Sequence, residues 1–112
     1  MAKRRRGRFR VAAKEDRTSD DGITFDSKKE MTRYYVLRSQ QQNGEIFDLR
    51  LQPEIVLHNV NGDKICSYFG DFWYEDVDGV KTLEDVKGYR TDVYMLKRKM
   101  VLLEYGIEIY ET

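Results

Sequence analysis

The dipeptide Asn61-Gly62 constrains the fold of this chain more than any other feature of its sequence. Extended stretches flank it: apolar residues recur with a period near two over residues 45–57, and an aromatic-rich run follows at residues 65–75. Asn-Gly between two such runs is the strongest short-range signal for a β-hairpin. The sequence therefore predicts two antiparallel strands that meet at this turn.

The only proline of the chain, Pro53, lies within the first of these extended stretches. Proline has no amide hydrogen to donate to a neighbouring strand, so it is confined to sheet edges and bends. We therefore expect the first stretch to form an edge or to bend at Gln52-Pro53. The run at residues 65–75 is predicted to form one long strand.

A helix is predicted ahead of the hairpin. Ser27 and Glu30 have the spacing of a capping box, in which the serine accepts a hydrogen bond from the third helical residue. Asn43-Gly44 would end this helix, because glycine readily takes the left-handed conformation that terminates helices.

A strand, a second helix and a final strand are predicted after the hairpin. A turn at residues 76–79 leads into a strand at residues 80–86, and Thr91 or Asp92 caps a helix that runs to about Tyr105. The last strand, at residues 107–110, should lie parallel to strand 80–86, because a β-α-β crossover joins them. The second helix is expected to turn Val93, Leu96, Met100 and Leu103 inward and Lys97, Arg98 and Lys99 outward.

These elements give the order α-β-β-β-α-β and predict an α/β fold of α+β type with a mixed sheet. The length of 112 residues suits a single domain. No apolar run approaches the roughly 20 residues that span a bilayer, and no apolar stretch follows the basic N-terminus as in a signal peptide. One cysteine, Cys66, and one histidine, His58, exclude a zinc site built from Cys and His alone. The lone cysteine favours a reducing, cytoplasmic setting.

Charge divides the chain unevenly. Residues 1–17 carry eight Lys or Arg against two acids, whereas the remaining 95 residues carry 12 basic and 18 acidic side chains. We expect residues 1–20 to form a disordered basic arm on an acidic domain at residues 21–112. Such an arm suggests a polyanionic partner, and a solubilising tail is the alternative interpretation.

Asp71 and Asp85 are the residues whose chemistry is most informative. A hairpin between their strands would place them near each other on a shared face, and alternation puts Lys87 on the same face as Asp85. Two close carboxylates repel unless a cation lies between them or one takes up a proton. Mg²⁺ prefers carboxylate oxygens, and a lysine can stabilise developing negative charge. The set fits metal-assisted phosphodiester hydrolysis, although solvated acids and a simple Asp85–Lys87 pair are the alternative.

Four short motifs in register resemble the PD-(D/E)xK nuclease superfamily, whose restriction-endonuclease-like core has the same α-β-β-β-α-β order. The closer resemblance is to short phage-encoded endonucleases related to Holliday-junction resolvases. It covers about residues 21–112 and rests on DGITFDSKKE (21–30), LQPEIVL (51–57), FGDFWY (69–74) and EDVKGYRTDVYMLKRK (84–99).

The resemblance implies catalytic roles for Glu30, Asp71, Asp85 and Lys87. Asp71 and Asp85 match the metal-binding acids, and Glu30 matches the acidic residue of the first helix that completes the site. Lys87 matches the lysine that orients the attacking water or stabilises the transition state. The implied cofactor is Mg²⁺, for which Mn²⁺ substitutes.

Two positions depart from the superfamily pattern, and a third has a supporting match. Gly70 replaces the proline that precedes the metal-binding aspartate. Glu84 precedes Asp85, so either could be the second ligand, and alternation favours Asp85. Gln52 matches a polar residue before the strand pair, with a supporting role or a role in the bend equally open.

These features predict a Mg²⁺-dependent DNA endonuclease, structure-selective for branched DNA as in Holliday-junction resolution, that acts in phage recombination. A homodimer is expected, because symmetric cutting of both strands favours two sites related by a two-fold axis. The alternatives are a non-catalytic DNA-binding accessory protein on the same fold and a structural module of a virion. The side chains expected to contact nucleic acid are Arg4, Arg5, Arg6, Arg90, Lys97 and Arg98.

Overall fold

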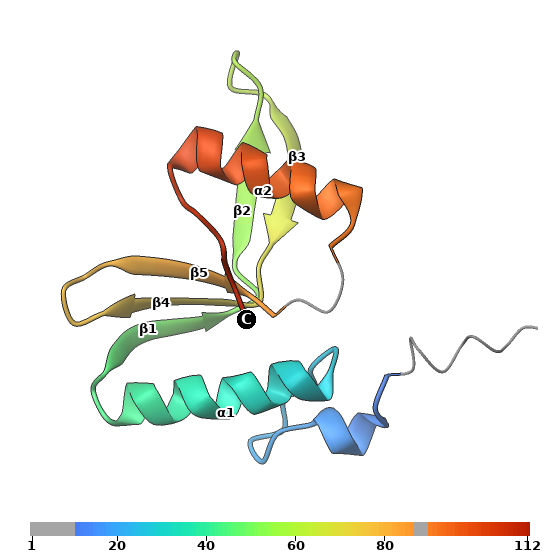
Figure 1. Ribbon diagram of the computed structural model, residues 1–112, viewed down its shortest axis with the longest axis vertical. Coiled ribbons are helices and arrows are strands. Elements are labelled where there is room, and N and C mark those ends of the chain that lie inside the picture. Colours follow the sequence, from blue (N-terminus) through green and yellow to red (C-terminus); the bar gives the residue numbers. More distant parts are fainter. Residues whose placement is uncertain (1–10, 87–89) are drawn as a thin grey trace, which may run out of the picture. The chain divides into compact units, whose positions relative to one another are not determined.

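The structure is a computed structural model that describes residues 11–86 and 90–112 (Figure 1). The chain divides into two compact units, residues 1–36 and 37–112, and each is described by itself. Helices and a mixed sheet confirm the predicted α+β class.

The described part of the first unit begins with an ordered segment. Lys14–Arg17 form a 3₁₀ helix (η2), and Thr18 bridges to Thr24 in antiparallel fashion. The guanidinium of Arg17 donates to the carbonyl oxygens of Ala12, at 3.0 Å, and Phe25, at 2.6 Å. Residues 11–20 of the predicted arm thus include a short helix and side chain-to-backbone hydrogen bonds, which form without an apolar periodicity.

Helix α1 spans Lys28–Gln42 and confirms the helix predicted from its caps. The hydroxyl of Ser27 accepts a hydrogen bond from the amide of Glu30 at 3.1 Å, as a capping serine does. At the other end, Gly44 has a φ of 75°, the left-handed conformation that the sequence predicted there.

The second unit contains two sheets. The four-stranded sheet has the order β1-β4-β5-β6, and β2 and β3 form a two-stranded sheet (Figure 1). Their bounds are β1 Ile46–Leu51, β2 Glu54–His58, β3 Lys64–Phe69, β4 Phe72–Asp76, β5 Lys81–Asp85 and β6 Tyr110–Glu111.

One bent hairpin joins the two sheets. β2 and β3 pair across the turn at Asn61-Gly62, and β1 and β4 pair in the same register beyond the bend, with Glu54 opposite Phe69 and Leu51 opposite Phe72. Between them, Gln52 N donates to the carbonyl of Asp71 at 3.0 Å. The bend predicted at Gln52-Pro53 is confirmed, but the single strand predicted at residues 65–75 is wrong, because the partner strand bends with it.

Gly70 sits at the inside of this bend, where the chain passes close to Leu83. A Cβ atom at residue 70 would lie 2.6 Å from Cδ1 of Leu83 and 3.5 Å from Cγ of Pro53. Leu83 is fully buried in the core, so its side chain has no room to move away. A side chain at this position would therefore meet Leu83, so the bend favours glycine at residue 70.

We therefore expect Gly70→Ala to lower the free energy of unfolding by about 1–3 kcal/mol, the usual cost of overpacking a core. Urea denaturation of the variant and the wild type would measure it. The control is the same substitution in a Leu83→Ala background, which removes the clashing atom. An equal cost in both backgrounds would show that Leu83 is not the constraint.

Helix α2 spans Asp92–Tyr105 and connects β5 to β6, which pair in parallel as predicted. Thr91 is its N-cap, since its side chain accepts a hydrogen bond from the amide of Tyr94 at 3.0 Å. Gly106 ends it with a φ of 68°. The final strand is shorter than predicted, with only Tyr110–Glu111 paired.

The inward face of α2 agrees with the predicted one at Met100, which packs against the core, and differs at Val93, Leu96 and Leu103, which are exposed. Tyr94 and Val101 are its buried residues, whereas Leu96 is 60% and Leu103 is 77% exposed. The helix lies across β2 and β3 (Figure 1), and Nζ of Lys97 reaches the carbonyl of Ser67 at 2.8 Å. The apolar spacing fitted two helix faces, and packing selected the one that carries Tyr94 and Val101. The core that results consists of Leu57, Tyr68, Leu83, Tyr94, Val101 and Ile109.

Candidate active site

The antiparallel pairing of β4 with β5 brings Asp71 and Asp85 together. The register ends with Phe72 opposite Glu84, and Asp71 N also donates to the carbonyl of Glu84 at 3.0 Å. Asp71 therefore lies just before β4, beside the end of β5 that carries Asp85. The carboxylate of Asp71 accepts a hydrogen bond from the amide of Val86, the residue after Asp85, so the two aspartates are close along the chain path at the bend, and that they act together stays a prediction.

Backbone and side-chain donors orient both carboxylates. Oδ2 of Asp71 accepts a hydrogen bond from the amide of Val86 at 2.6 Å. Oδ2 of Asp85, a residue only 5% exposed, accepts one from the hydroxyl of Tyr68. Each carboxylate therefore has a fixed direction before any ligand arrives.

Tyr68 comes from β3, on the far side of the bend, and is buried. Burial, and then the hydrogen bond to Asp85, raise the pKa of the Tyr68 phenol above its ordinary value. The phenol therefore stays protonated over the physiological range and acts as a donor to Asp85. The sequence interpretation assigned the tyrosines to the core and missed this contact. The contact could have been anticipated in general terms, because a tyrosine hydroxyl that is buried in the core needs a hydrogen-bond partner.

Glu84 points away from this pair. It is opposite Phe72, so it lies on the other face of β5 from Asp85, and it is fully buried. Its carboxylate accepts hydrogen bonds from the hydroxyls of Tyr74 at 2.7 Å and Thr112 at 3.0 Å. The alternation that favoured Asp85 over Glu84 as a partner of Asp71 agrees with this register.

Gln52 lies beside Asp71 through the backbone. Its amide donates to the carbonyl of Asp71, and its φ is 51°. A residue other than glycine rarely adopts this left-handed conformation, which costs about 1–2 kcal/mol. Gln52 is thus a residue of the bend and a neighbour of Asp71 at the same time.

Glu30 lies in the first turn of α1 and is 6% exposed. Its backbone amide caps the helix through Ser27, and that its carboxylate joins Asp71 and Asp85 stays a prediction. Lys87 and the predicted phosphate contacts Arg4, Arg5 and Arg6 lie outside the described residues.

The chemistry of Asp71 and Asp85 suits a hard divalent cation. Within residues 11–86 and 90–112, no cluster of three or more His, Cys, Asp or Glu side chains is arranged to hold a metal ion, so this site offers two carboxylates. Mg²⁺ is commonly bound by one or two carboxylates, with waters and substrate phosphates as the remaining ligands. The donors therefore fit Mg²⁺ bound together with a phosphate-containing substrate.

Comparison with protein families gives one match. The family model described as "Protein of unknown function (DUF1064)" matches residues 10–109. The chain belongs to this family. The range matched by DUF1064 includes Glu30, Asp71, Asp85 and Lys87. No curated protein and no solved structure matches the chain.

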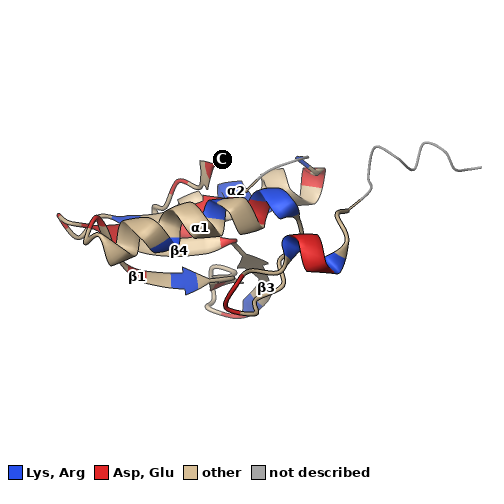
Figure 2. Cartoon of the chain, turned by 90° about the horizontal axis from the view of Figure 1, so that it is seen from below, with Lys and Arg blue, Asp and Glu red and all other residues tan. Residues whose placement is uncertain are grey.

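The basic residues of α2 that were predicted to bind phosphate have partners within this DUF1064 chain. Figure 2 shows basic and acidic residues interspersed over the described chain. Nη1 of Arg98 lies 3.1 Å from Oε2 of Glu111, and Arg90 pairs with the other oxygen of the same carboxylate. Lys97 contacts the carbonyl of Ser67, so the expectation of an outward basic face is wrong for Lys97 and Arg98.

Glu111 is a second residue that the sequence interpretation missed. It is opposite Asp85 across the parallel pair β5 and β6. The hydroxyl of Tyr94 donates to it at 2.5 Å, and this bond, ahead of Arg90 and Arg98, lowers the pKa of the Glu111 carboxyl. Asp85 and Glu111 are therefore neighbouring acids, each oriented by a tyrosine.

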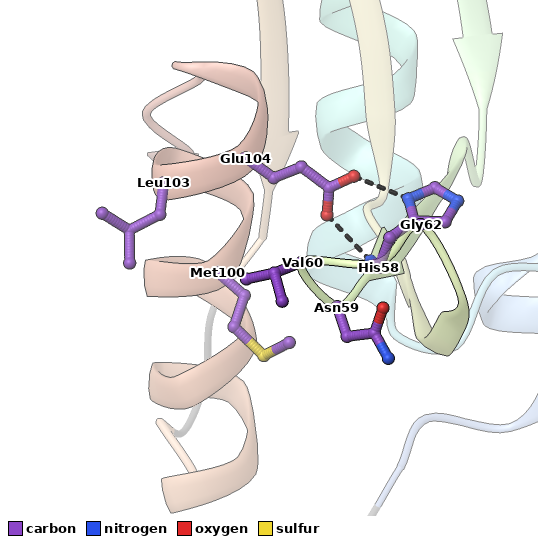
Figure 3. Close-up of a pocket in the computed structure, with 7 residues that line it drawn as sticks. All are labelled: His58, Asn59, Val60, Gly62, Met100, Leu103 and Glu104. Carbon is purple, nitrogen blue, oxygen red and sulfur yellow. Dashed lines mark hydrogen bonds and ion pairs between the residues drawn. The ribbon is translucent and has the colours of Figure 1, made fainter.

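A pocket of about 850 Å³ lies away from the predicted site residues, between the tip of the β2–β3 hairpin and the C-terminal half of α2 (Figure 3). Val60, Met100 and Leu103 contribute its apolar lining. Glu104 accepts hydrogen bonds from the amide of His58 at 2.8 Å and faces its Nδ1 at 2.6 Å. The amide of His58 is the main cause that lowers the pKa of Glu104. The His58–Glu104 pair thus connects the β2–β3 hairpin to α2.

None of the described helices is long and apolar enough to cross a membrane.

Proposed function

We propose that this DUF1064 member is a divalent-metal-dependent DNA endonuclease that hydrolyses phosphodiester bonds. The position of Asp71 beside the end of β5, where its carboxylate accepts a hydrogen bond from the amide next to Asp85, carries the proposal. Two neighbouring, oriented carboxylates, followed within two residues by Lys87, are the functional groups that this reaction needs.

Asp71 and Asp85 would hold Mg²⁺, and Glu30 would complete the site or contact it through water. When bound, the ion would polarise the phosphate and lower the pKa of a coordinated water. Asp71 is partly exposed and Asp85 is buried, so Asp71 would meet the substrate while Asp85 anchors the site. Lys87 would orient the attacking water and stabilise the charge that develops on the phosphate.

DNA, branched or duplex, is the proposed partner. Arg90 keeps a side chain that is 53% exposed, so it can turn toward a phosphate, and the basic residues at positions 3–10 would add contacts that do not depend on sequence. Affinity should fall steeply as salt rises, because each neutralised phosphate releases counterions. A two-fold dimer that acts in the cytoplasm would cut both strands of a junction symmetrically.

The second candidate is a non-catalytic DNA-binding accessory protein on the same fold. The internal contacts of Asp85 with Tyr68 and of Asp71 with the amide of Val86 favour it, because they are also what stable structural carboxylates would make. Metal uptake separates the two functions. An accessory protein should bind DNA without taking up Mg²⁺ or Mn²⁺ in calorimetry.

A cleavage assay tests the leading function. Purified protein with Mg²⁺ or Mn²⁺ would be given a labelled four-way junction, a flap, a linear duplex and a single strand, with EDTA and Lys87→Ala as controls. We expect metal-dependent cutting that is strongest on branched DNA and lost in both controls. Binding of DNA without any cutting would transfer the assignment to the accessory function, and Lys87→Ala that cuts as well as the wild type would contradict the proposed mechanism.

A further inference from the structure

We propose that Tyr68 is a positioning residue of the candidate active site, whose hydroxyl fixes the carboxylate of Asp85 in the direction needed to bind the metal ion. This inference rests on the proposed function, and it adds a residue to the site that the nuclease resemblance does not include.

The bent hairpin makes this contact possible. Tyr68 is in β3, two residues before the bend at Gly70, and Asp71 follows the bend immediately. The same short segment therefore supplies one candidate ligand and the donor that orients the other. Since β3 belongs to the two-stranded sheet and Asp85 to the four-stranded one, the hydrogen bond from Tyr68 also connects the two sheets at the site.

Burial on both sides makes the Tyr68–Asp85 contact directional. Tyr68 and Asp85 are each 5% exposed. A buried carboxylate needs donors, and a buried phenol needs an acceptor, so each group fixes the other. Hydrogen-bond partners of metal ligands set the ligand orientation, and their loss typically weakens metal affinity about 10- to 100-fold.

Tyr94 provides a matched control within the same core. Its ring centroid lies 6.2 Å from that of Tyr68, and its hydroxyl also donates to a carboxylate, that of Glu111. Asp85 and Glu111 are directly paired across β5 and β6. Tyr68→Phe and Tyr94→Phe therefore remove the same atom from two adjacent tyrosine–carboxylate pairs, of which only the first includes a candidate metal ligand.

The test is calorimetric titration of the full chain with Mn²⁺, without DNA, for the wild type and both variants. Metal-dependent rise of the unfolding temperature is the second readout, since it reports binding even if a variant is less stable. We expect Tyr68→Phe to bind Mn²⁺ about 10- to 100-fold more weakly and Tyr94→Phe to bind within about twofold of the wild type.

Each other outcome has a distinct meaning. If Tyr68→Phe binds Mn²⁺ as tightly as the wild type or tighter, the positioning role is overturned and the proposed function stands. If both variants weaken equally, the hydroxyls act through general stability, and the positioning role is again overturned. A wild type that takes up no Mn²⁺ would remove the proposed function and this inference together.

Discussion

Asp71→Asn is expected to reduce the rate of metal-dependent DNA cleavage about 1000-fold or more. The substitution removes one of the two negative charges that would hold the cation, and a loss of about 4 kcal/mol of transition-state stabilisation corresponds to that factor. The asparagine keeps a carbonyl oxygen that can accept the amide of Val86, so the local backbone should be preserved. Single-turnover cleavage of a labelled junction would measure the effect.

Glu75→Gln is the matched control for this experiment. Glu75 lies on β4, which Asp71 precedes, and it is opposite Lys81 at the other end of the pairing. Glu75→Gln should leave both the cleavage rate and the Mn²⁺ affinity unchanged. If Asp71→Asn and Glu75→Gln behaved alike, the candidate site would lie elsewhere in the chain.

Substitutions of the neighbouring acids Glu84 and Asp85 are expected to have opposite effects: the first should lower stability and the second should abolish metal binding. Glu84→Ala should cost about 3–4 kcal/mol of unfolding free energy, because it opens a cavity and leaves the buried hydroxyl of Tyr74 and that of Thr112 without their acceptor. Its effect on Mn²⁺ affinity should be small, since Glu84 lies on the opposite face of β5 from Asp85.

Asp85→Asn should show the reverse behaviour. The amide carbonyl can still accept the hydrogen bond from Tyr68, so stability should stay within about 1 kcal/mol of the wild type. Mn²⁺ binding and cleavage should be lost. Urea denaturation and calorimetry on the two variants would measure both quantities. If folded Glu84→Ala bound Mn²⁺ much more weakly than the wild type, Glu84 rather than Asp85 would be the metal ligand.

The fold was predictable where local chemistry decides. Asn61-Gly62 sets a turn, Ser27 and Thr91 cap helices, and Gly106 ends one, because each acts on the backbone within a few residues. The parallel pairing of the last strand followed from the handedness of β-α-β crossovers, which holds for almost any sequence. These features do not depend on which distant side chains meet.

The inward face of α2 was not predictable in the same way. Apolar residues occupy two sides of this helix, so spacing alone allowed either Leu96 and Leu103 or Tyr94 and Val101 to face the core. Packing against β2 and β3 chose the second pair. The same packing brings Nζ of Lys97 to the backbone carbonyl of Ser67. The aliphatic part of a lysine side chain can be buried while its charged end keeps a polar contact.

For the candidate site, the sequence predicts that Asp71 and Asp85 lie near each other, because the turn that joins their strands is a local property of the chain. The close approach of Gly70 to Leu83 at the bend, and the contact of Tyr68 with the carboxylate of Asp85, depend instead on tertiary packing. Contacts of this kind join residues from different sheets. They depend on how close-packed surfaces meet, which periodicity along one chain does not encode.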